Sequence, residues 1–472
     1  MRKLFFISVI CFIGCNRQLD LAPENTLTDR EVFKTEAGTE QALAEVYFNL
    51  LDAVTSNIAY VYGDFTTDNL RHSTYYDIYA NGQSTPDDAV IADLWTVYFK
   101  SINLANNAIA NIPAYAAYPK EVQDPLVAEA RFIRAYAYLD LLKFFGDGAL
   151  SGQMEGRGLP LQLTPFKGYN TGEVIARSTN AAVYAQIIKD LEESIPFLKD
   201  NQSSDLRTRS RATKGGARAL LARTYLYMGR MEEAAAAARE VLTKVPAIYE
   251  LTSSLTSLFP ANPNGTAQTL TKEYLLAFPV SHMTSSSTSM NNNLGNGYYF
   301  KRSFWINSGF TQSFEAGDKR VSELMFKGDQ VYNPDHFNEL TTFKFNNSNG
   351  RDNVPVIRLA EVMLTAAEAI AETEGVTQDA VKWLNDVRSR SLPDATPYTV
   401  ADFADAQALV NTILQQRRWE LAFEGHYRYD LIRTGRPLQT PDLEEKRKVL
   451  PVPQSEIDIS NGLIQQNTGY QN

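Results

Sequence analysis

Cysteine is nearly missing from this sequence of 472 residues, because it occurs only as Cys11 and Cys15. A disulfide framework in the rest of the chain is therefore excluded. After the first fourteen residues, no apolar run approaches the about 20 residues that a membrane-spanning helix needs. Basic residues are also in deficit, since 45 Lys and Arg stand against 55 Asp and Glu. The net charge of −10 argues against a nucleic-acid ligand, because phosphate binding depends on clustered basic side chains.

Residue patterns that mark common enzymes are missing as well. The four histidines, His72, His282, His336 and His426, form no HExxH motif and no Cys–His zinc spacing. The sequence has no GxSxG elbow, Walker loop or dinucleotide-binding glycine motif. A glycosidase stays open, because its two carboxylates are defined by separation in space rather than in sequence. No catalytic residue, metal site or cofactor is predicted.

The first residues have the features of an export signal. Residues 1–3 supply positive charge, and the apolar run 4–14 ends in small residues. The sequence FIGC, which ends at Cys15, is typical of a bacterial lipoprotein in which this cysteine becomes the acylated first residue. We predict a signal peptide over residues 1–14 and lipidation of Cys15. Ordinary secretion with cleavage at another position is the alternative.

Apolar residues recur at helical spacing over much of the chain. They predict helices at about 39–51, 89–112, 124–145, 180–199 and 400–423. The clearest repeat, residues 214–246, has the spacings of a tetratricopeptide unit, with Ala234 and Ala238 allowing close helix contact. Residues 351–390, the pair 124–145 with 180–199, and 400–423 are interpreted as more degenerate units. Stacked units bury a shared core, so the predicted fold class is mostly α, with a tetratricopeptide-like helical repeat scaffold.

Two polar stretches interrupt the helical pattern. Residues 55–88 lack periodicity, and residues 249–353 are rich in turn formers with short candidate strands such as EYLLAFPV. We interpret the second stretch as a loop-rich insertion on the scaffold. Aromatic rings beside amides suit carbohydrate, because C–H faces stack on rings while hydroxyls bond to amides. The alternative is that these aromatics pack as a small core beneath the loops. The ligand-binding candidates from both stretches are Asp68, Asn69, Arg71, Tyr75, Tyr76, Asn296, Tyr298 and Trp305.

Charge is concentrated in residues 417–436, RRWELAFEGHYRYDLIRTGR. Arg417 and Glu424 fall on the apolar face of a predicted helix, where a buried charge must be paired. With Asp430 and Arg433 they reach the density of an active site, yet they extend a core helix. We therefore interpret these four residues as a structural polar network and not as a catalytic or ligand site.

Six stretches, taken in order, carry a family resemblance. They are LDLAPENTLTD after Cys15; the W..Y..I...N pattern of Trp95, Tyr98, Ile102 and Asn106; RSTNAAVYAQIIKDLEESIPFL with RATKGGARALLARTYLYMG; VPVIRLAEVMLTAAEAIAE; RRWELAFEGHYRYDLIRTG; and LPVPQSEIDISNGLIQQNTGY. With these motifs the chain resembles the SusD/RagB family of outer-membrane nutrient-binding lipoproteins. The resemblance covers nearly the whole chain and is weakest at about 250–340.

The resemblance implies a binding protein rather than an enzyme. Family members are lipid-anchored on the outer membrane, exposed at the cell surface, and partner a TonB-dependent (SusC-like) transporter. They capture oligosaccharides for import, or in some members peptides, so a peptide-binding protein of the RagB type is the alternative. The scaffold is expected largely to face the transporter, and the loop-rich part to help build the ligand site. The family motifs carry over no ligand residues to this chain.

The implied organisation is one SusD-like domain over residues 15–472. Its helical scaffold is expected at about 39–250 and 351–436, and its ligand-side insertion at about 251–350. An extended C-terminal tail is expected over 437–472.

Overall fold

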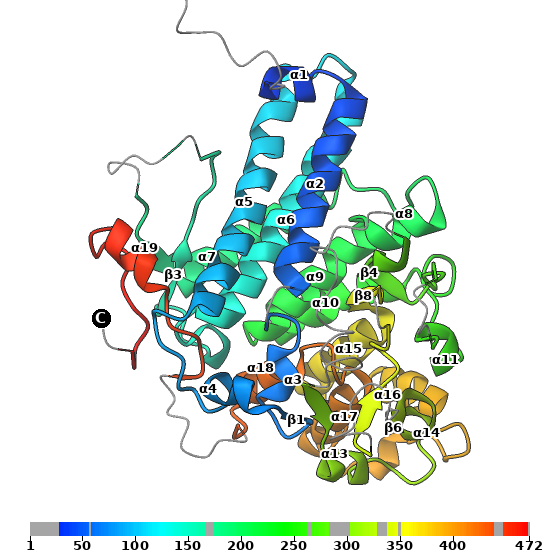
Figure 1. The fold of residues 1–472 in the computed structure, drawn as a ribbon. Helices are drawn as coiled ribbons and strands as arrows, with labels where there is room; N and C mark the ends of the chain where they lie inside the picture. The colour runs from blue at the N-terminus through cyan, green and yellow to red at the C-terminus, as the bar shows by residue number, and fades with distance from the viewer. Residues whose placement is uncertain are drawn as a thin grey trace, which may run out of the picture.

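Helices make up most of the protein (Figure 1). The structure, a computed structural model, describes residues 28–55, 58–166, 168, 174–261, 266–282, 303–327, 338–347, 351–438 and 447–470. The long helices are α2 Glu36–Thr55, α5 Ala89–Tyr115, α6 Lys120–Phe145, α7 Asn180–Ser194, α9 Lys214–Tyr227, α10 Met231–Leu242, α15 Leu359–Glu374, α16 Gln378–Ser391 and α17 Ala406–Glu420. The predicted mostly α fold class is confirmed.

Short elements occupy the connections. The short helices are α1 Asp29–Phe33, α3 Tyr62–Phe65, α4 Asp77–Ala80, α8 Asp205–Ser210, α11 Leu255–Leu258, α13 Ser308–Gln312, α14 Lys319–Leu324, α18 Tyr427–Arg433 and α19 Gln454–Ile459. Single 3-10 turns are η1 Thr74–Tyr76, η2 Ala149–Ser151, η4 Val280–His282 and η7 Val400–Asp402. The strands are β1 Leu70–His72, β2 Arg157–Pro160, β3 Arg177–Thr179, β4 Tyr274–Phe278, β5 Phe304–Ile306, β6 Met325–Lys327, β7 Leu340–Thr342 and β8 Val354–Arg358.

The long helices pack as antiparallel neighbours along the chain. Helices α2, α5 and α6 stand side by side, and α7, α9, α10, α15, α16 and α17 continue the stack (Figure 1). Gly229, whose φ is +72°, makes the turn between α9 and α10, where the sequence predicts the clearest repeat. Fully buried Ala234 and Ala238 let α10 approach its neighbours closely. Most buried apolar residues from Phe33 to Ile464 form one continuous core across this stack, and a smaller cluster around Phe259 and Tyr274 is separate from it.

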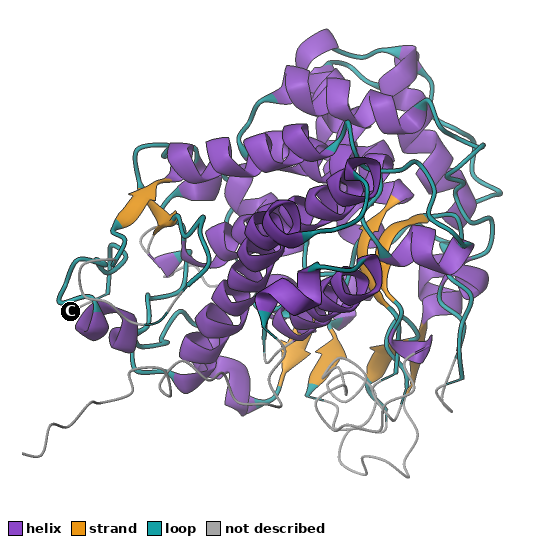
Figure 2. Ribbon diagram, turned by 90° about the horizontal axis from the view of Figure 1, so that it is seen from above, coloured by secondary structure: helices purple, strands orange, loops and turns teal. Residues whose placement is uncertain are grey.

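The strands described here form four antiparallel pairs: β1–β5, β2–β3, β4–β8 and β6–β7. Figure 2 shows β2–β3 apart from the others, on the opposite side of the helices. The predicted strand EYLLAFPV corresponds to β4. Its partner β8 corrects the prediction of helix from residue 351, because the β-branched run at 354–358 forms a strand before α15 begins.

The helix predicted at 400–423 is shorter than expected at both ends. The Asp405 side chain accepts a hydrogen bond from the Ala408 N–H at 2.8 Å and so caps α17 immediately before Ala406. At the other end the helix stops at Glu420, and Phe423 has a φ of +69°, which an α-helix does not permit. Glu424 therefore lies in a turn after the helix and not on its apolar face.

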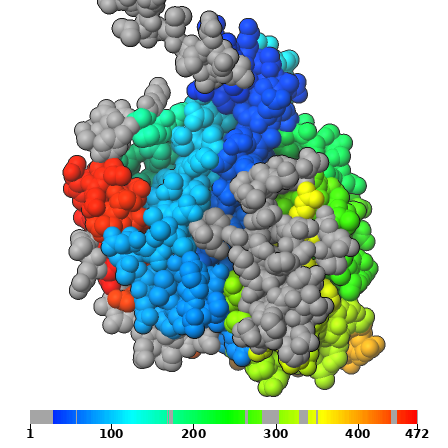
Figure 3. Space-filling view, viewed as in Figure 1, coloured from blue at the N-terminus to red at the C-terminus, as the bar shows by residue number. Residues whose placement is uncertain are grey.

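The C-terminal residues return to the N-terminal helices. In the space-filling view, α19 lies at the edge of the surface formed by α5 (Figure 3). Asn467 donates to the backbone oxygens of Phe145 and Leu450 at 3.0 and 2.7 Å, which fixes this tail against the end of α6. The described part of the C-terminal tail thus contains one short helix and packs on the scaffold.

Candidate functional site

The structure brings two predicted ligand-side segments together although they are more than 200 residues apart in sequence. Strand β1 pairs with β5, and Arg71 lies opposite Trp305 in the register. The ladder continues on both sides, because Ser73 N–H donates to Ser303 O at 2.9 Å and Asn307 N–H donates to Asn69 O at 3.0 Å. We call β1, η1 and β5, with the adjoining residues 68 and 69, the ligand-side loop pair.

Aromatic rings in this loop pair divide into a packed set and an exposed one. Tyr76 packs against Phe65 and Phe304, with ring centroids 5.2 and 4.7 Å apart, as the small-core alternative predicts. Tyr75 instead is 62% exposed and meets the Tyr76 ring edge-on, at 5.0 Å. Tyr75 therefore offers a rigid aromatic surface to solvent, supported from below by Tyr76.

The polar candidates of the same segment differ in their availability. Asn69 is fully buried; its Nδ2 donates to Asp64 Oδ1 at 3.1 Å, and its Oδ1 accepts from Arg418 Nε at 2.8 Å. Its carboxamide is thus engaged in the protein, which corrects the expectation that it bonds a ligand. The Asp68 side chain is 50% exposed and pairs with Arg418, while half-exposed Arg71 pairs with Glu339.

The remaining candidates are one buried tryptophan and residues that lie outside the described part of the chain. Trp305 is only 7% exposed, so little of its ring surface is open to a stacking ligand. Asn296, Tyr298 and the predicted lipidation site Cys15 lie outside the described residues.

A buried carboxylate, Asp64, joins the ligand-side loop pair to the turn after α17. Its Oδ1 accepts from Phe423 N–H at 3.0 Å and its Oδ2 accepts from Gly425 N–H at 2.7 Å. Burial raises the pKa of Asp64 to about 6, although these hydrogen bonds and the Asn69 amide oppose the rise. Gly63 makes the approach possible, since a Cβ there would lie 2.3 Å from the Gly425 carbonyl oxygen.

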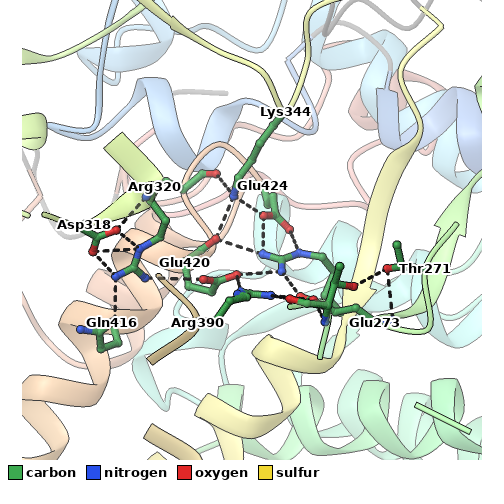
Figure 4. A network of polar contacts seen from close by, with 12 residues as sticks. Thr271, Glu273, Asp318, Arg320, Lys344, Arg390, Gln416, Glu420 and Glu424 are labelled. Atoms are coloured by element: carbon green, nitrogen blue, oxygen red, sulfur yellow. Dashed lines mark hydrogen bonds and ion pairs between the residues drawn. The ribbon is translucent and has the colours of Figure 1, made fainter. Parts of the chain in front are cut away.

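The predicted network residue Glu424, labelled in Figure 4, belongs to a cluster in which Arg358 pairs with Glu273, Glu420 and Glu424. Glu424 accepts from Arg358 Nε at 2.8 Å and from Lys344 Nζ at 2.6 Å, and the cations hold its pKa below the ordinary value even though burial opposes this. Every side chain of the cluster is 4% exposed or less. The members are four cations, Arg320, Lys344, Arg358 and Arg390, and four carboxylates, Glu273, Asp318, Glu420 and Glu424. The charges are balanced, as buried charges must be.

Arg417, Asp430 and Arg433 belong to a second cluster. Arg417 Nε lies 3.3 Å from Asp430 Oδ2, and Arg433 Nε donates to Asp430 Oδ1 at 2.8 Å. Glu368 of α15 completes the group by accepting from Arg433 Nη2 at 2.8 Å. The four predicted network residues are thus buried and ion-paired, but Arg417 and Glu424 pair with separate partners and not with each other.

Sequence reasoning missed Arg358, the centre of the first cluster. A usable signal was present, because Arg358 interrupts the apolar run VPVIRLAEV, and a charge inside such a run needs a buried partner. Arg418 was also missed. It follows Arg417 directly, but its partners Asp68 and Asn69 lie about 350 residues earlier, so no local pattern identifies them.

The charged side chains of this region divide into buried pairs and exposed groups. The strongly paired carboxylates are buried in balanced clusters, whereas the open part of the ligand-side loop pair presents an aromatic ring and two half-exposed charges. Within the described residues, no three His, Cys, Asp or Glu side chains gather as metal ligands. No helix in the same part of the chain is both long and apolar enough to cross a bilayer.

Comparison with known proteins agrees with this architecture. A family model described as the SusD family matches residues 329–442, and one described as starch-binding and associating with the outer membrane matches residues 19–226. The SusD-like protein P2 of Formosa agariphila is 25% identical, with 99% of each chain covered.

Solved structures show the same fold. A SusD superfamily protein of Bacteroides vulgatus superposes with a TM-score of 0.77 at 22% identity, covering 93% of this chain and all of the other. A laminarin-binding SusD-like protein superposes with a TM-score of 0.72, also at 22% identity, covering 93% of this chain and 100% of the other.

Proposed function

This chain belongs to the SusD/RagB family, and from that membership we propose that it is a glycan-binding lipoprotein of the cell surface. It captures oligosaccharides and delivers them to a partner TonB-dependent, SusC-like transporter. The anchor is a lipid on Cys15, and the location is the outer face of the outer membrane. The description of one matching family model as starch-binding and outer-membrane-associated supports this, as does the laminarin-binding neighbour.

The exposed ring of Tyr75 is the observation that carries the proposal. The ring is 62% exposed and rests on Tyr76, which itself packs on Phe65. A pyranose ring fits this surface, because its C–H face stacks on the aromatic face. The half-exposed Asp68 carboxylate and Arg71 guanidinium precede the ring by seven and four residues and can bond sugar hydroxyls.

A peptide ligand of the RagB type is the second candidate. The same two charged side chains favour it, since one carboxylate and one guanidinium can pair with the amino and carboxylate groups of a short peptide. A glycosidase is a third and weaker candidate, because the two catalytic carboxylates that it requires are not identified.

Calorimetric titration separates these candidates. Laminarin and starch oligosaccharides, and a matched set of short peptides, are titrated into the mature protein. We expect binding in the glycan set, and we expect Tyr75→Ala to weaken it by about 5- to 30-fold, which corresponds to the roughly 1–2 kcal/mol of one stacking contact. The melting temperature should not change, because Tyr75 is largely exposed.

Tyr115→Ala is the matched control. Tyr115 is 40% exposed at the C-terminal end of α5, far in sequence from the ligand-side loop pair. The Tyr115→Ala variant should bind glycan with the affinity of the wild type. Equal affinity of the Tyr75→Ala variant would refute the role of this ring. Binding to peptides alone would favour the RagB type, and release of shorter sugars on prolonged incubation with polysaccharide would identify a glycosidase.

A further inference from the structure

Arg418 connects the charged stretch 417–436 with the residues before β1 and with helix α13, which follows β5. It lies near the end of α17, and only 12% of its side chain is exposed. Its Nε donates to Asn69 Oδ1 at 2.8 Å, and its Nη2 lies 2.9 Å from Asp68 Oδ1. These contacts hold the backbone immediately before β1.

The same guanidinium also reaches the segment that follows β5. It lies over the ring of Phe310 in α13, at 5.2 Å from the centroid, and over Tyr427 at 4.5 Å. Phe310 is only four residues beyond the end of β5, and Leu70 pairs with Ile306, so one side chain touches the continuation of both strands at the same end of the β1–β5 pair. A planar guanidinium suits this task, because its edge forms two hydrogen bonds while its faces pack on rings.

Asp64 provides a second, independent attachment of the same loop. It accepts from Asn69 Nδ2 and from the two backbone N–H groups of the turn after α17. The Asn69 carboxamide is therefore held at its oxygen by Arg418 and at its nitrogen by Asp64. These two contacts fix the orientation of the Asn69 side chain. Strand β1 begins at the next residue, and Tyr75 comes shortly after it in the chain.

We propose that Arg418 is a positioning residue for the ligand site: it holds β1 and β5 in register and orients Asp68 toward the ligand. This rests on the proposed function of the ligand-side loop pair. Arg418 is too buried to offer its own guanidinium to a ligand, so it acts through Asp68, Asn69 and the loop that follows them. Asp68 Oδ1 pairs with Arg418 and half of the Asp68 side chain is exposed, so the carboxylate can also accept from a sugar hydroxyl.

The test compares Arg418→Met and Arg418→Lys with wild type in two measurements. Amide hydrogen exchange of residues 70–76 is followed in the ligand-free protein, and calorimetry gives the Kd of the laminarin or starch oligosaccharide that wild type binds most tightly. We expect faster exchange in Arg418→Met and a Kd about tenfold higher, as when the competent loop population falls to about one-tenth. Arg418→Lys should resemble Arg418→Met, because an ammonium group cannot make the paired contacts of the fork.

Arg388→Met is the matched control. Arg388 is also a buried arginine at the end of a helix, paired with a carboxylate through two nitrogens and lying over a tyrosine ring at 4.3 Å. Its partners Glu315 and Tyr398 are not in the loop pair, so its loss should leave exchange at 70–76 and the Kd unchanged.

Unchanged exchange in Arg418→Met would overturn the positioning role, and so would an unchanged Kd. If the wild type binds no glycan, the proposed function fails, but the exchange measurement still decides whether Arg418 orders the loop.

Discussion

At the scale of single residues, the buried carboxylate of Asp64 differs from those of Glu424 and Asp430. Glu424 and Asp430 are paired with cations, which hold their pKa values below the ordinary range despite burial. Asp64 has amide N–H donors as its hydrogen-bond partners, so burial prevails and raises its pKa to about 6. The charge state of the attachment between the loop pair and the scaffold therefore changes near pH 6.

The sign of the resulting pH dependence follows from this shift. The folded protein holds the Asp64 proton more tightly than the unfolded chain, whose ordinary pKa is 3.8. Stability from this group is thus fully present below about pH 4 and is lost as the pH rises through about 6. Relative to Asp64→Asn, wild type should lose up to about 3 kcal/mol of unfolding free energy between pH 4 and pH 7, as measured by denaturant titration.

Asp402→Asn serves as a control of opposite sign. The backbone N–H and hydroxyl of Thr399 lower the pKa of Asp402 at the surface below its ordinary value of 3.8, so wild type should lose its stability advantage over this variant as the pH falls below that value. A difference between wild type and Asp64→Asn that does not vary with pH would contradict the assigned role of Asp64.

At the scale of elements, a contact between two turns positions the site. Helix α3 and the turn after α17 meet backbone to backbone at Gly63 and Gly425, and the φ of +77° at Gly425 is favourable for glycine. Neither turn is visible as a periodic pattern in the sequence. The contact explains why a stretch with the charge density of an active site has a structural function next to the ligand-side loop pair.

Gly63→Ala tests this contact. The new Cβ would lie 2.3 Å from the Gly425 carbonyl oxygen, and backbone at that point cannot move aside as a flexible side chain can. We expect a loss of about 1–3 kcal/mol of unfolding free energy by chemical denaturation, as for other overpacked sites.

Gly216→Ala makes the same substitution in helix α9 at an uncrowded position. Its nearest neighbours would be 3.4 and 3.5 Å away, an ordinary contact distance. Alanine is the better helix former, so this variant should be as stable as wild type or more stable. Equal stability of the two variants would show that the α3 turn adapts and does not fix the site.

At the scale of the whole molecule, the Arg358 cluster joins segments that are distant in sequence. Glu273 precedes β4, Arg358 ends β8, Arg390 lies in α16, and Glu420 and Glu424 come from the end of α17 and its turn. The loop-rich insertion and the helical scaffold are thereby held by the same buried charges. Loss of a charge from the Arg358 cluster should therefore lower the stability of the whole protein.

Glu424→Ala should lower the melting temperature substantially. It leaves Arg358 and Lys344 partly unpaired in the interior, and breaking a buried pair costs about 3–5 kcal/mol. The backbone N–H groups of Phe423 and Gly425 still reach Asp64, so the folded fraction should bind ligand with unchanged affinity. Thermal melting and calorimetry check the two outcomes.

Glu374→Ala removes a carboxylate from a surface pair with Arg239, where both side chains are about 40% exposed. Its cost should not exceed about 1 kcal/mol. A stable Glu424→Ala variant that had lost ligand binding would contradict the structural role of residues 417–436 and would indicate that they form part of a binding site.

The sequence predicts the helical framework well because apolar periodicity is local. The start of α5 at Ala89 and both helices of the α9–α10 hairpin are found where the pattern places them. The burial and charge density of residues 417–436 are also readable. The sequence does not show which residues pair, because only the tertiary fold brings the partners of Arg417 and Glu424 near. The ligand-side loop pair is recognisable by composition, but the internal bonds of Asn69 and the burial of Trp305 depend on distant strands.

Helix α5 separates the first described residues from the candidate site. Helix α1 is attached to the C-terminal end of α5, where Asn111 Nδ2 donates to Asp29 Oδ2 at 3.2 Å. At its N-terminal end, the hydroxyl of Tyr79, just after the ligand-side loop pair, donates to the capping residue Asp88 at 3.2 Å. Helix α5 has 27 residues, so these ends are about 40 Å apart. A surface that holds the chain through the residues before Thr28 would therefore be kept at a distance from a ligand captured at the ligand-side loop pair.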